Sequence, residues 1–190
     1  MDYYIVDNFF NADMLKKVVE ESKTLNYYNQ NNNKYVATVG NRTSKINVLK
    51  PEIFEAVKES IDGLLNKDCN YELYFHKLSL ADFPKHNKPS VIRNNMPKVH
   101  LMKDEDWQNF NLSIEGWHRD DVGYSYAGVV YLNENPYPNT GTLLEINEKV
   151  IPIENNFNRL ALYKANILHR VENVFPDEND PRLTLTIFVK

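Results

Sequence analysis

Short strand-like runs fill the last third of the sequence, and they constrain the fold more than any other feature. Residues 126–132, 142–146, 159–163 and 183–189 are rich in β-branched and aromatic side chains. Turn-forming pairs separate these runs, at Asn135-Pro136, Pro138-Asn139, Asn155-Asn156 and Asp180-Pro181. This spacing predicts an antiparallel barrel or sandwich.

Helices are predicted before residue 71, with one strand ahead of them at residues 3–6. In the first helix we expect Asn11 as the N-cap and Asp13 in the first turn, with an apolar stripe to about residue 21. The second helix is expected to begin at Pro51 and to bury an apolar face made up of Phe54, Val57, Ile61, Leu64 and Leu65. Residues 71–80 then alternate as a strand does. The predicted fold class is therefore mainly β with N-terminal helices.

Composition limits the class of protein. A length of 190 residues suits one domain spanning residues 1–190, and the 42% hydrophobic content suffices for a core. A net charge of −4, with no run of five or more basic residues, argues against a nucleic-acid binder. Cys69 is the only cysteine, so an intrachain disulfide is excluded and a reducing compartment is expected. Neither a signal-peptide pattern nor an apolar run of roughly 20 residues is found, which favours a cytoplasmic protein without a membrane span.

A His-x-Asp triplet carries the first chemical signal. His118 and Asp120 point to the same face of an extended chain, so both side chains can reach one metal ion. His169 follows 51 residues later and can arrive from a different strand. Two imidazoles and one carboxylate form the facial triad of non-heme Fe(II) oxygenases. The triplet alone is a weak signal, because a solvated loop pair gives the same pattern.

Residues near the end of the chain add an anion-binding signal. Arg182, Thr184 and Thr186 lie on one face of a predicted strand, and an arginine on such a face suits the bidentate binding of a carboxylate. Tyr131 ends an earlier strand, and its hydroxyl can donate to the same carboxylate. Simpler interpretations are an edge-strand arginine paired with Asp180 and an ordinary core tyrosine.

The order of these motifs resembles that of a known family. The series is His118-x-Asp120, Tyr131-Leu132-Asn133, Gly141-Thr142, His169 and Arg182-x-x-x-Thr186-x-Phe188. It resembles the prolyl-hydroxylase-like branch of the Fe(II)/2-oxoglutarate dioxygenases, and looks closest to small bacterial and phage-type members. The resemblance covers most of the chain and is strongest over residues 117–190.

This resemblance implies a fold, a set of cofactors and a site. The fold would be a double-stranded β-helix, a jelly-roll barrel like that of the cupins. His118, Asp120 and His169 would bind Fe(II) as the catalytic centre. Arg182 would bind the distal carboxylate of 2-oxoglutarate, helped by Tyr131 and by Thr184 or Thr186. With O2 as the other co-substrate, the products would include succinate and CO2, and the presence of Asp120 favours hydroxylation over halogenation.

Two other functions are also compatible with these residues. One is a cupin-type metalloenzyme that does not use 2-oxoglutarate, and the other is a non-catalytic barrel that serves as a binding module. The substrate also stays open among a protein side chain, an amino acid, a nucleotide and a small metabolite. We see no match to the substrate-binding residues of peptidyl-prolyl enzymes. The proline-containing segment 82–116, with the Asn-rich loop at 29–33, is expected to border the barrel mouth and contact substrate.

Overall fold

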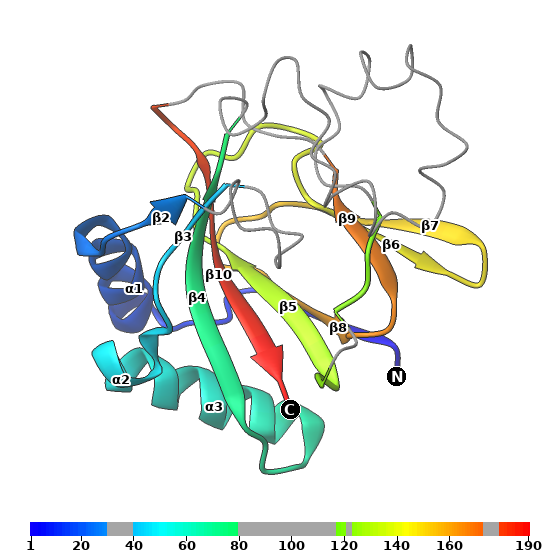
Figure 1. Ribbon diagram of the computed structural model, residues 1–190, viewed down its shortest axis with the longest axis horizontal. Helices are drawn as coiled ribbons and strands as arrows, with labels where there is room; N and C mark the ends of the chain where they lie inside the picture. The colour runs from blue at the N-terminus through cyan, green and yellow to red at the C-terminus, as the bar shows by residue number, and fades with distance from the viewer. Residues whose placement is uncertain (30–39, 80–116, 121–122, 173–178) are drawn as a thin grey trace.

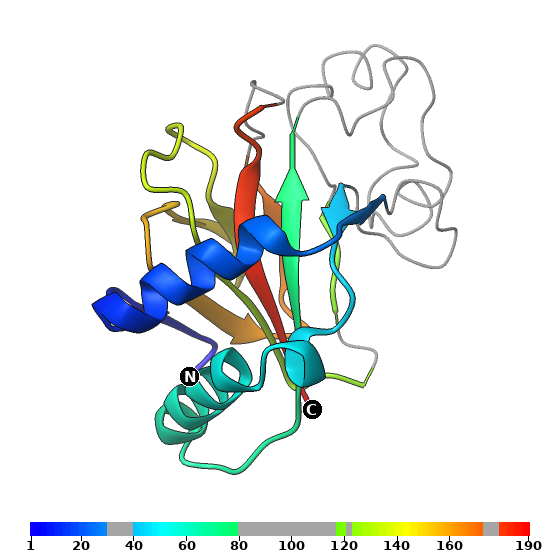
Figure 2. The same ribbon diagram turned by 90° about the vertical axis from the view of Figure 1, so that its left-hand side faces the viewer.

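The fold consists of a helical layer and two β-sheets. The computed structural model describes residues 1–29, 40–79, 117–120, 123–172 and 179–190. The helices in these ranges are α1 (Ala12–Thr24), α2 (Ile46–Leu49) and α3 (Pro51–Leu65). Figure 1 shows the strands crossing the molecule diagonally, and Figure 2 shows α1 and α3 covering one side of them.

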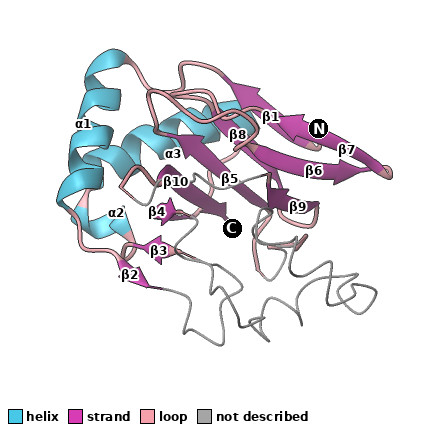
Figure 3. Cartoon of the chain, turned by 90° about the horizontal axis from the view of Figure 1, so that it is seen from above, coloured by secondary structure: helices cyan, strands magenta, loops and turns pink. Residues whose placement is uncertain are grey.

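The larger sheet has seven strands and every pairing in it is antiparallel. Its strand order is β1 (Tyr3–Val6), β8 (Leu160–Lys164), β5 (Tyr126–Tyr131), β10 (Arg182–Val189), β4 (Tyr71–Leu78), β3 (Asn41–Arg42) and β2 (Tyr28–Asn29). The smaller sheet has the order β7 (Lys149–Ile153), β6 (Thr142–Ile146) and β9 (Leu168–Val171). Seen from above, the helices lie on one side of the larger sheet and the smaller sheet on the other (Figure 3).

Strand β10 shows why the sequence forms these layers. It lies between β5 and β4, and its side chains alternate between the two faces of the sheet. Leu185, Ile187 and Val189 are buried in the core between the sheet and the helices. The opposite face carries Arg182, Thr184, Thr186 and Phe188, as the period-two pattern predicted. One strand therefore supplies both the core and the wall of a cavity.

The predicted first turns of α1 and α3 are confirmed by the structure. The Asn11 side chain accepts a hydrogen bond from the Met14 backbone N–H at 2.9 Å, which caps α1. Pro51 occupies the first turn of α3, and Asn66, the C-cap that follows the helix, is in a left-handed conformation. On α3 the structure buries Ile53 fully and Phe54 only in part, so the expected apolar face is rotated slightly.

Other details of the fold differ from the expectation. The sequence did not predict β7 or β9, and the observed ends of β5, β8 and β10 differ by one residue from the predicted ones. Within the described ranges no strand is shared between the two sheets, so their hydrogen-bond ladders do not close into one barrel. The expected lid, residues 82–116, and most of the Asn-rich loop lie outside the described residues. Among the described helices, none has the length and apolar character needed to cross a bilayer.

Candidate active site

Three potential metal ligands meet between the two sheets. His118, Asp120 and His169 each offer one ligand atom, and these atoms lie within 4.8 Å of one another. The Asp120 carboxylate is 3.2 Å from His169 Nε2 and 4.0 Å from His118 Nε2. Ligands bound at right angles with bonds of roughly 2.0–2.2 Å lie roughly 3 Å apart, so Asp120 and His169 already have this spacing, and His118 would have to move closer for one ion to bind all three. The structure thus brings together the three residues grouped from the sequence.

Backbone hydrogen bonds hold the two ligand-bearing segments against each other. His118 and His169 exchange both of their backbone hydrogen bonds, each at 3.0 Å. The Asp120 N–H donates to the Ala165 carbonyl at 2.9 Å, and Arg119 Nε donates to the Asn166 carbonyl at 2.9 Å. The imidazole rings of the two histidines consequently lie 4.3 Å apart, centre to centre. The positions of the ligands are therefore set largely by the main chain.

The orientation of His169 suits metal binding. Its Nδ1 is 3.0 Å from the carbonyl oxygen of Ile167. Because a carbonyl can only accept, Nδ1 carries the proton and donates. In the neutral ring this leaves the lone pair on Nε2, the nitrogen that faces Asp120. Such a backbone contact is how ligating histidines are commonly oriented in metalloproteins.

Asp120 is ionised although it is partly buried. Burial disfavours the charged carboxylate, but its contact with His169 and the electrostatic effects of His169, His118 and Arg42 outweigh it. Together they lower the pKa of Asp120 to about 2. The carboxylate is therefore available as a negatively charged ligand near neutral pH.

Arg182 is buried on the wall of the same cavity. Its side chain is only 2% exposed, and its Nε donates to the Thr140 carbonyl at 2.9 Å. The guanidinium carbon lies 5.3 Å from the centre of the Tyr131 ring. The Asn133 side chain fixes the start of β10, because it accepts from the Leu183 N–H at 2.7 Å and donates to the Pro181 carbonyl at 3.1 Å. The Tyr131-Leu132-Asn133 motif thus positions Arg182 from two sides.

Tyr131 lies behind the cavity wall. Its side chain is fully buried, and its hydroxyl donates to Thr142 Oγ1 at 2.8 Å. Burial raises the pKa of Tyr131, so its hydroxyl stays protonated. Thr142 lines the cavity and Tyr131 does not, so the structure shows Tyr131 bonded to a cavity residue. The predicted contact of Tyr131 with a bound carboxylate stays a prediction.

Two threonine hydroxyls on β10 face the cavity without a partner. Thr184 is fully buried and Thr186 is 8% exposed. The Oγ1 atoms of both are buried and make no hydrogen bond within the described structure. Buried hydroxyls nearly always find a partner, so these two are candidates for hydrogen bonds to a bound polar molecule.

The cavity joins the two parts of the site. Its empty volume, together with the open solvent at its mouth, is about 550 Å³. Its lining includes the three candidate metal ligands together with Arg182, Thr184 and Thr186. It also includes Arg42 and His76, which the sequence analysis did not predict as site residues. His76 on β4 pairs with Arg42 on β3 and with Thr184 on β10. In the sequence, the only signal for the face of the sheet on which His76 lies was the alternation of side chains along β4, counted back from Leu78.

Comparison with known proteins identifies the fold. The chain matches no protein-family model and no curated protein sequence. Among solved structures, a prolyl-4-hydroxylase from Pseudomonas putida has a TM-score of 0.61 and 14% identity, over 100% of this chain and 92% of that one. A prolyl hydroxylase from Trichoplax adhaerens, solved with a hypoxia-inducible-factor peptide, has a TM-score of 0.65 and 15% identity, over 99% and 83%.

A third solved structure extends the comparison. SnoN, a non-heme α-ketoglutarate-dependent epimerase of nogalamycin biosynthesis, has a TM-score of 0.65 and 10% identity, over 99% of this chain and 76% of that one. The chain therefore has the fold found in the 2-oxoglutarate/Fe(II) oxygenases. Within that class, the neighbours include prolyl hydroxylases, so the likeness to the prolyl-hydroxylase-like branch is confirmed at the level of the fold.

Proposed function

We propose that this chain is an Fe(II)- and 2-oxoglutarate-dependent oxygenase that hydroxylates its substrate. One observation carries the proposal: a His-Asp-His cluster and a buried arginine with two partnerless hydroxyls line the same cavity. In the net reaction one oxygen atom of O2 enters the substrate C–H bond as a hydroxyl group. The other enters succinate, and 2-oxoglutarate loses CO2. The two sheets would then be those of a double-stranded β-helix within a single domain.

The metal end of the cavity fits Fe(II). His118, Asp120 and His169 would hold the ion and leave coordination positions for 2-oxoglutarate and O2. SnoN, which shares this fold, has been solved with Fe3+ and α-ketoglutarate. When bound, the metal and co-substrate supply the oxidising chemistry, which no protein side chain provides. The task of the three ligands is to hold and orient the ion.

The other end of the cavity fits the distal carboxylate of 2-oxoglutarate. Arg182 would bind this carboxylate, and Thr184 and Thr186 would donate to it from the same face of β10. Tyr131 would support this site from behind Arg182. The burial of all four side chains excludes water, which strengthens each polar contact to the ligand.

The two other candidate functions have weaker support. A metalloenzyme that does not use 2-oxoglutarate leaves the two buried hydroxyls of Thr184 and Thr186 without a ligand. A non-catalytic binding module gives no reason for an ionised Asp120 to lie beside two imidazole rings. The cytoplasmic location and the absence of a membrane partner stay expectations from the sequence.

Anaerobic titration tests the proposal. We expect wild-type protein to bind Fe(II) and then to develop a visible charge-transfer absorption when 2-oxoglutarate chelates the ion. His169→Ala is expected to lose Fe(II) binding. Arg182→Ala is expected to keep Fe(II) binding but to need a 2-oxoglutarate concentration higher by roughly 30-fold or more, because one partner of a buried charge pair is lost. Arg182→Lys is expected to restore part of the 2-oxoglutarate affinity.

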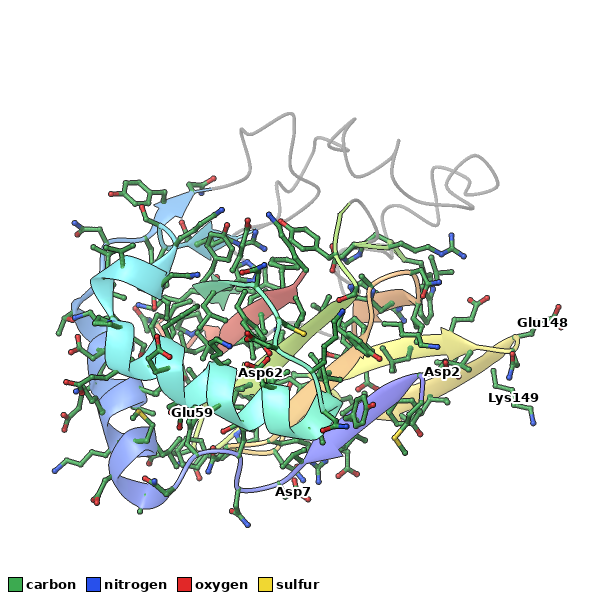
Figure 4. All side chains as sticks on the ribbon, turned by 90° about the horizontal axis from the view of Figure 1, so that it is seen from below. Asp2, Asp7, Glu59, Asp62, Glu148 and Lys149 are labelled. Atoms are coloured by element: carbon green, nitrogen blue, oxygen red, sulfur yellow. The ribbon has the colours of Figure 1, made fainter. Side chains whose placement is uncertain are left out.

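Lys149→Gln removes a positive charge at the exposed end of the β6–β7 hairpin (Figure 4) and is expected to behave as wild type. Metal binding without any spectral response to 2-oxoglutarate would favour the cupin-type metalloenzyme instead. Absence of metal binding in the wild type would leave only the binding module.

A further inference from the structure

Thr142 on β6 faces the cavity from the smaller sheet. Leu144, two residues further along β6, pairs with His169 of β9. Residues i and i+2 of a strand share a face, so the Thr142 side chain points to the same side of the sheet as the candidate metal ligand His169. Thr142 is only 3% exposed and lines the cavity. Arg182 and Thr184 line it from the larger sheet, so both walls of the cavity carry polar side chains.

The backbone around Thr142 is held on both sides. Thr142 pairs with Ile153 of β7 and with Val171 of β9. The preceding residue, Gly141, lies so close to β7 that an added Cβ would be 1.9 Å from the Ile153 carbonyl oxygen. The Gly141 carbonyl accepts from the Glu172 N–H at 3.1 Å. A β-branched side chain on a fixed backbone has few rotamers, so the Thr142 hydroxyl is preorganised.

The hydrogen bond between Tyr131 and Thr142 has a direction. The Tyr131 hydroxyl lies 2.8 Å from Thr142 Oγ1, and the phenol is the more acidic of the two groups and therefore the better donor. Burial raises the pKa of Tyr131, and the positive charge of Arg182 acts against that rise. Because a cation attracts the lone pairs of the phenol oxygen, the proton of Tyr131 points away from Arg182 and toward Thr142.

Thr142 therefore has a proton to donate. Its oxygen accepts from Tyr131, and within the described residues Tyr131 is the one hydrogen-bond partner of the Thr142 hydroxyl. The proton of this hydroxyl thus lacks an acceptor among those residues, although a buried donor without a partner is costly. A hydroxyl whose oxygen already accepts a hydrogen bond is also the stronger donor. Thr142 is consequently ready to bind an anion in the cavity.

The position of Thr142 suits the far end of 2-oxoglutarate. Residues two apart on a strand are separated by roughly 7 Å, so Thr142 lies about this far along the sheet from the row that contains His169. Four carbon–carbon bonds join the two carboxyl carbons of 2-oxoglutarate, which are roughly 5 Å apart in the extended molecule. With one hydrogen bond of roughly 2.7 Å added, the molecule is long enough to span this step.

From these observations we infer that Thr142 donates a hydrogen bond to the distal carboxylate of 2-oxoglutarate and that Tyr131 acts through Thr142 as a positioning residue. Arg182 and Thr184 hold this carboxylate from the larger sheet and Thr142 holds it from the smaller one, so the co-substrate links the two sheets. This differs from the direct contact of Tyr131 predicted from the sequence. The inference rests on the proposed function and adds to it the residue that selects for a distal carboxylate.

Anaerobic titration of the Fe(II)-loaded protein with two 2-oxo acids tests the inference. In 2-oxopentanoate a methyl group replaces the distal carboxylate of 2-oxoglutarate, while the 2-oxo acid end that chelates the metal is the same. We expect Thr142→Val to weaken 2-oxoglutarate binding by roughly 10- to 150-fold, as for a lost hydrogen bond to a charged group. Binding of 2-oxopentanoate should not be weakened. Thr142→Ser keeps the hydroxyl and should retain most of the 2-oxoglutarate affinity.

A double variant separates direct from indirect action of Tyr131. Tyr131→Phe alone should weaken 2-oxoglutarate binding less than Thr142→Val does, and added to Thr142→Val it should cause no further loss. Stability without ligand should respond differently. Thr142→Val leaves the buried Tyr131 hydroxyl without an acceptor, so the double variant should melt at a higher temperature than Thr142→Val. A gain in stability without a gain in affinity is not produced by general damage to the fold.

Thr43→Val is the control, because the Thr43 hydroxyl accepts from the Phe75 N–H and does not line the cavity. It should lose stability and keep the full 2-oxoglutarate affinity. Three results would overturn the inference. They are unchanged 2-oxoglutarate affinity in Thr142→Val, an equal loss of affinity for both 2-oxo acids, and a further loss when Tyr131→Phe is added. Each is measured by the charge-transfer absorption and leaves the proposed function standing, whereas absence of that absorption in the wild type overturns both.

Discussion

Replacing Thr184 by valine is expected to stabilise the ligand-free protein. The Thr184 hydroxyl is fully buried and has no hydrogen-bond partner in the described structure, whereas valine has nearly the same shape. A buried polar group without a partner costs roughly 1–3 kcal/mol, so its removal should raise the free energy of unfolding by that order. For a chain of 190 residues, 1 kcal/mol corresponds to roughly 2–4 °C in melting temperature.

The same substitution is expected to weaken 2-oxoglutarate binding. A hydrogen bond to a charged group contributes roughly 1.5–3 kcal/mol, which corresponds to roughly 10- to 150-fold in dissociation constant. Thermal unfolding without ligand and anaerobic titration with Fe(II) and 2-oxoglutarate measure the two effects. Stability and affinity should therefore change in opposite directions, which general damage to the fold does not produce.

Thr43→Val is the matched control for Thr184→Val. Thr43 is also buried, but its hydroxyl accepts a hydrogen bond from the Phe75 N–H at 3.0 Å. Its replacement leaves that N–H without a partner and should lower the free energy of unfolding by roughly 1–3 kcal/mol. If Thr184→Val is destabilising to the same extent, its hydroxyl has a partner and the reasoning fails. An unchanged affinity for 2-oxoglutarate would remove Thr184 from the co-substrate site.

Two further predictions concern stability. Gly141→Ala should destabilise the protein by roughly 1–3 kcal/mol in urea unfolding, because a Cβ there would lie 1.9 Å from the Ile153 carbonyl oxygen. Gly63→Ala on α3, where a Cβ meets nothing within 4 Å, should instead stabilise it by roughly 0.5–1 kcal/mol, and equal effects would refute the packing argument. Burial opposes ionisation of Glu72, but its hydrogen bonds from Lys190, Lys45, Tyr74 and Tyr124 lower its pKa from 4.5 to about 2. The ionised Glu72 thus contributes roughly 3 kcal/mol to the free energy of unfolding above pH 4.5, and this contribution is lost as the pH falls toward 2. Glu72→Gln should therefore be less stable than wild type at pH 7 and approach the wild-type stability in acid. A stability difference that does not depend on pH would contradict this.

Alternation along single strands made much of the site predictable. Arg182, Thr184 and Thr186 share a face of β10 by period two, and the structure places all three on the cavity wall. His118 and Asp120 were grouped by the same rule. Where the signal lies in the spacing of residues along one strand, the residues that share a face could be predicted from the sequence alone.

Features that depend on pairing between distant strands could not be predicted. Strand β9 has four residues, and His169 and Arg170 lie in its middle, so its sequence resembles a loop until β6 pairs with it. Strand β7 contains Pro152 and is largely exposed, which conceals its strand character. Arg42 reaches the cavity only because of the register of β3 on β4. Such registers are set by the whole sheet and not by local sequence.

The position of β10 has a consequence for the order of folding. Both of its partners, β4 and β5, precede it in the sequence, so during synthesis on the ribosome they leave the exit tunnel before the strand that joins them. Until β10 arrives, the pairing edges of β4 and β5 that it will occupy stay open, which is the situation in which chaperones protect nascent chains. Because β10 carries core leucine and isoleucine side chains alternately with Arg182 and the two threonines, its docking completes the core and the cavity wall in a single step.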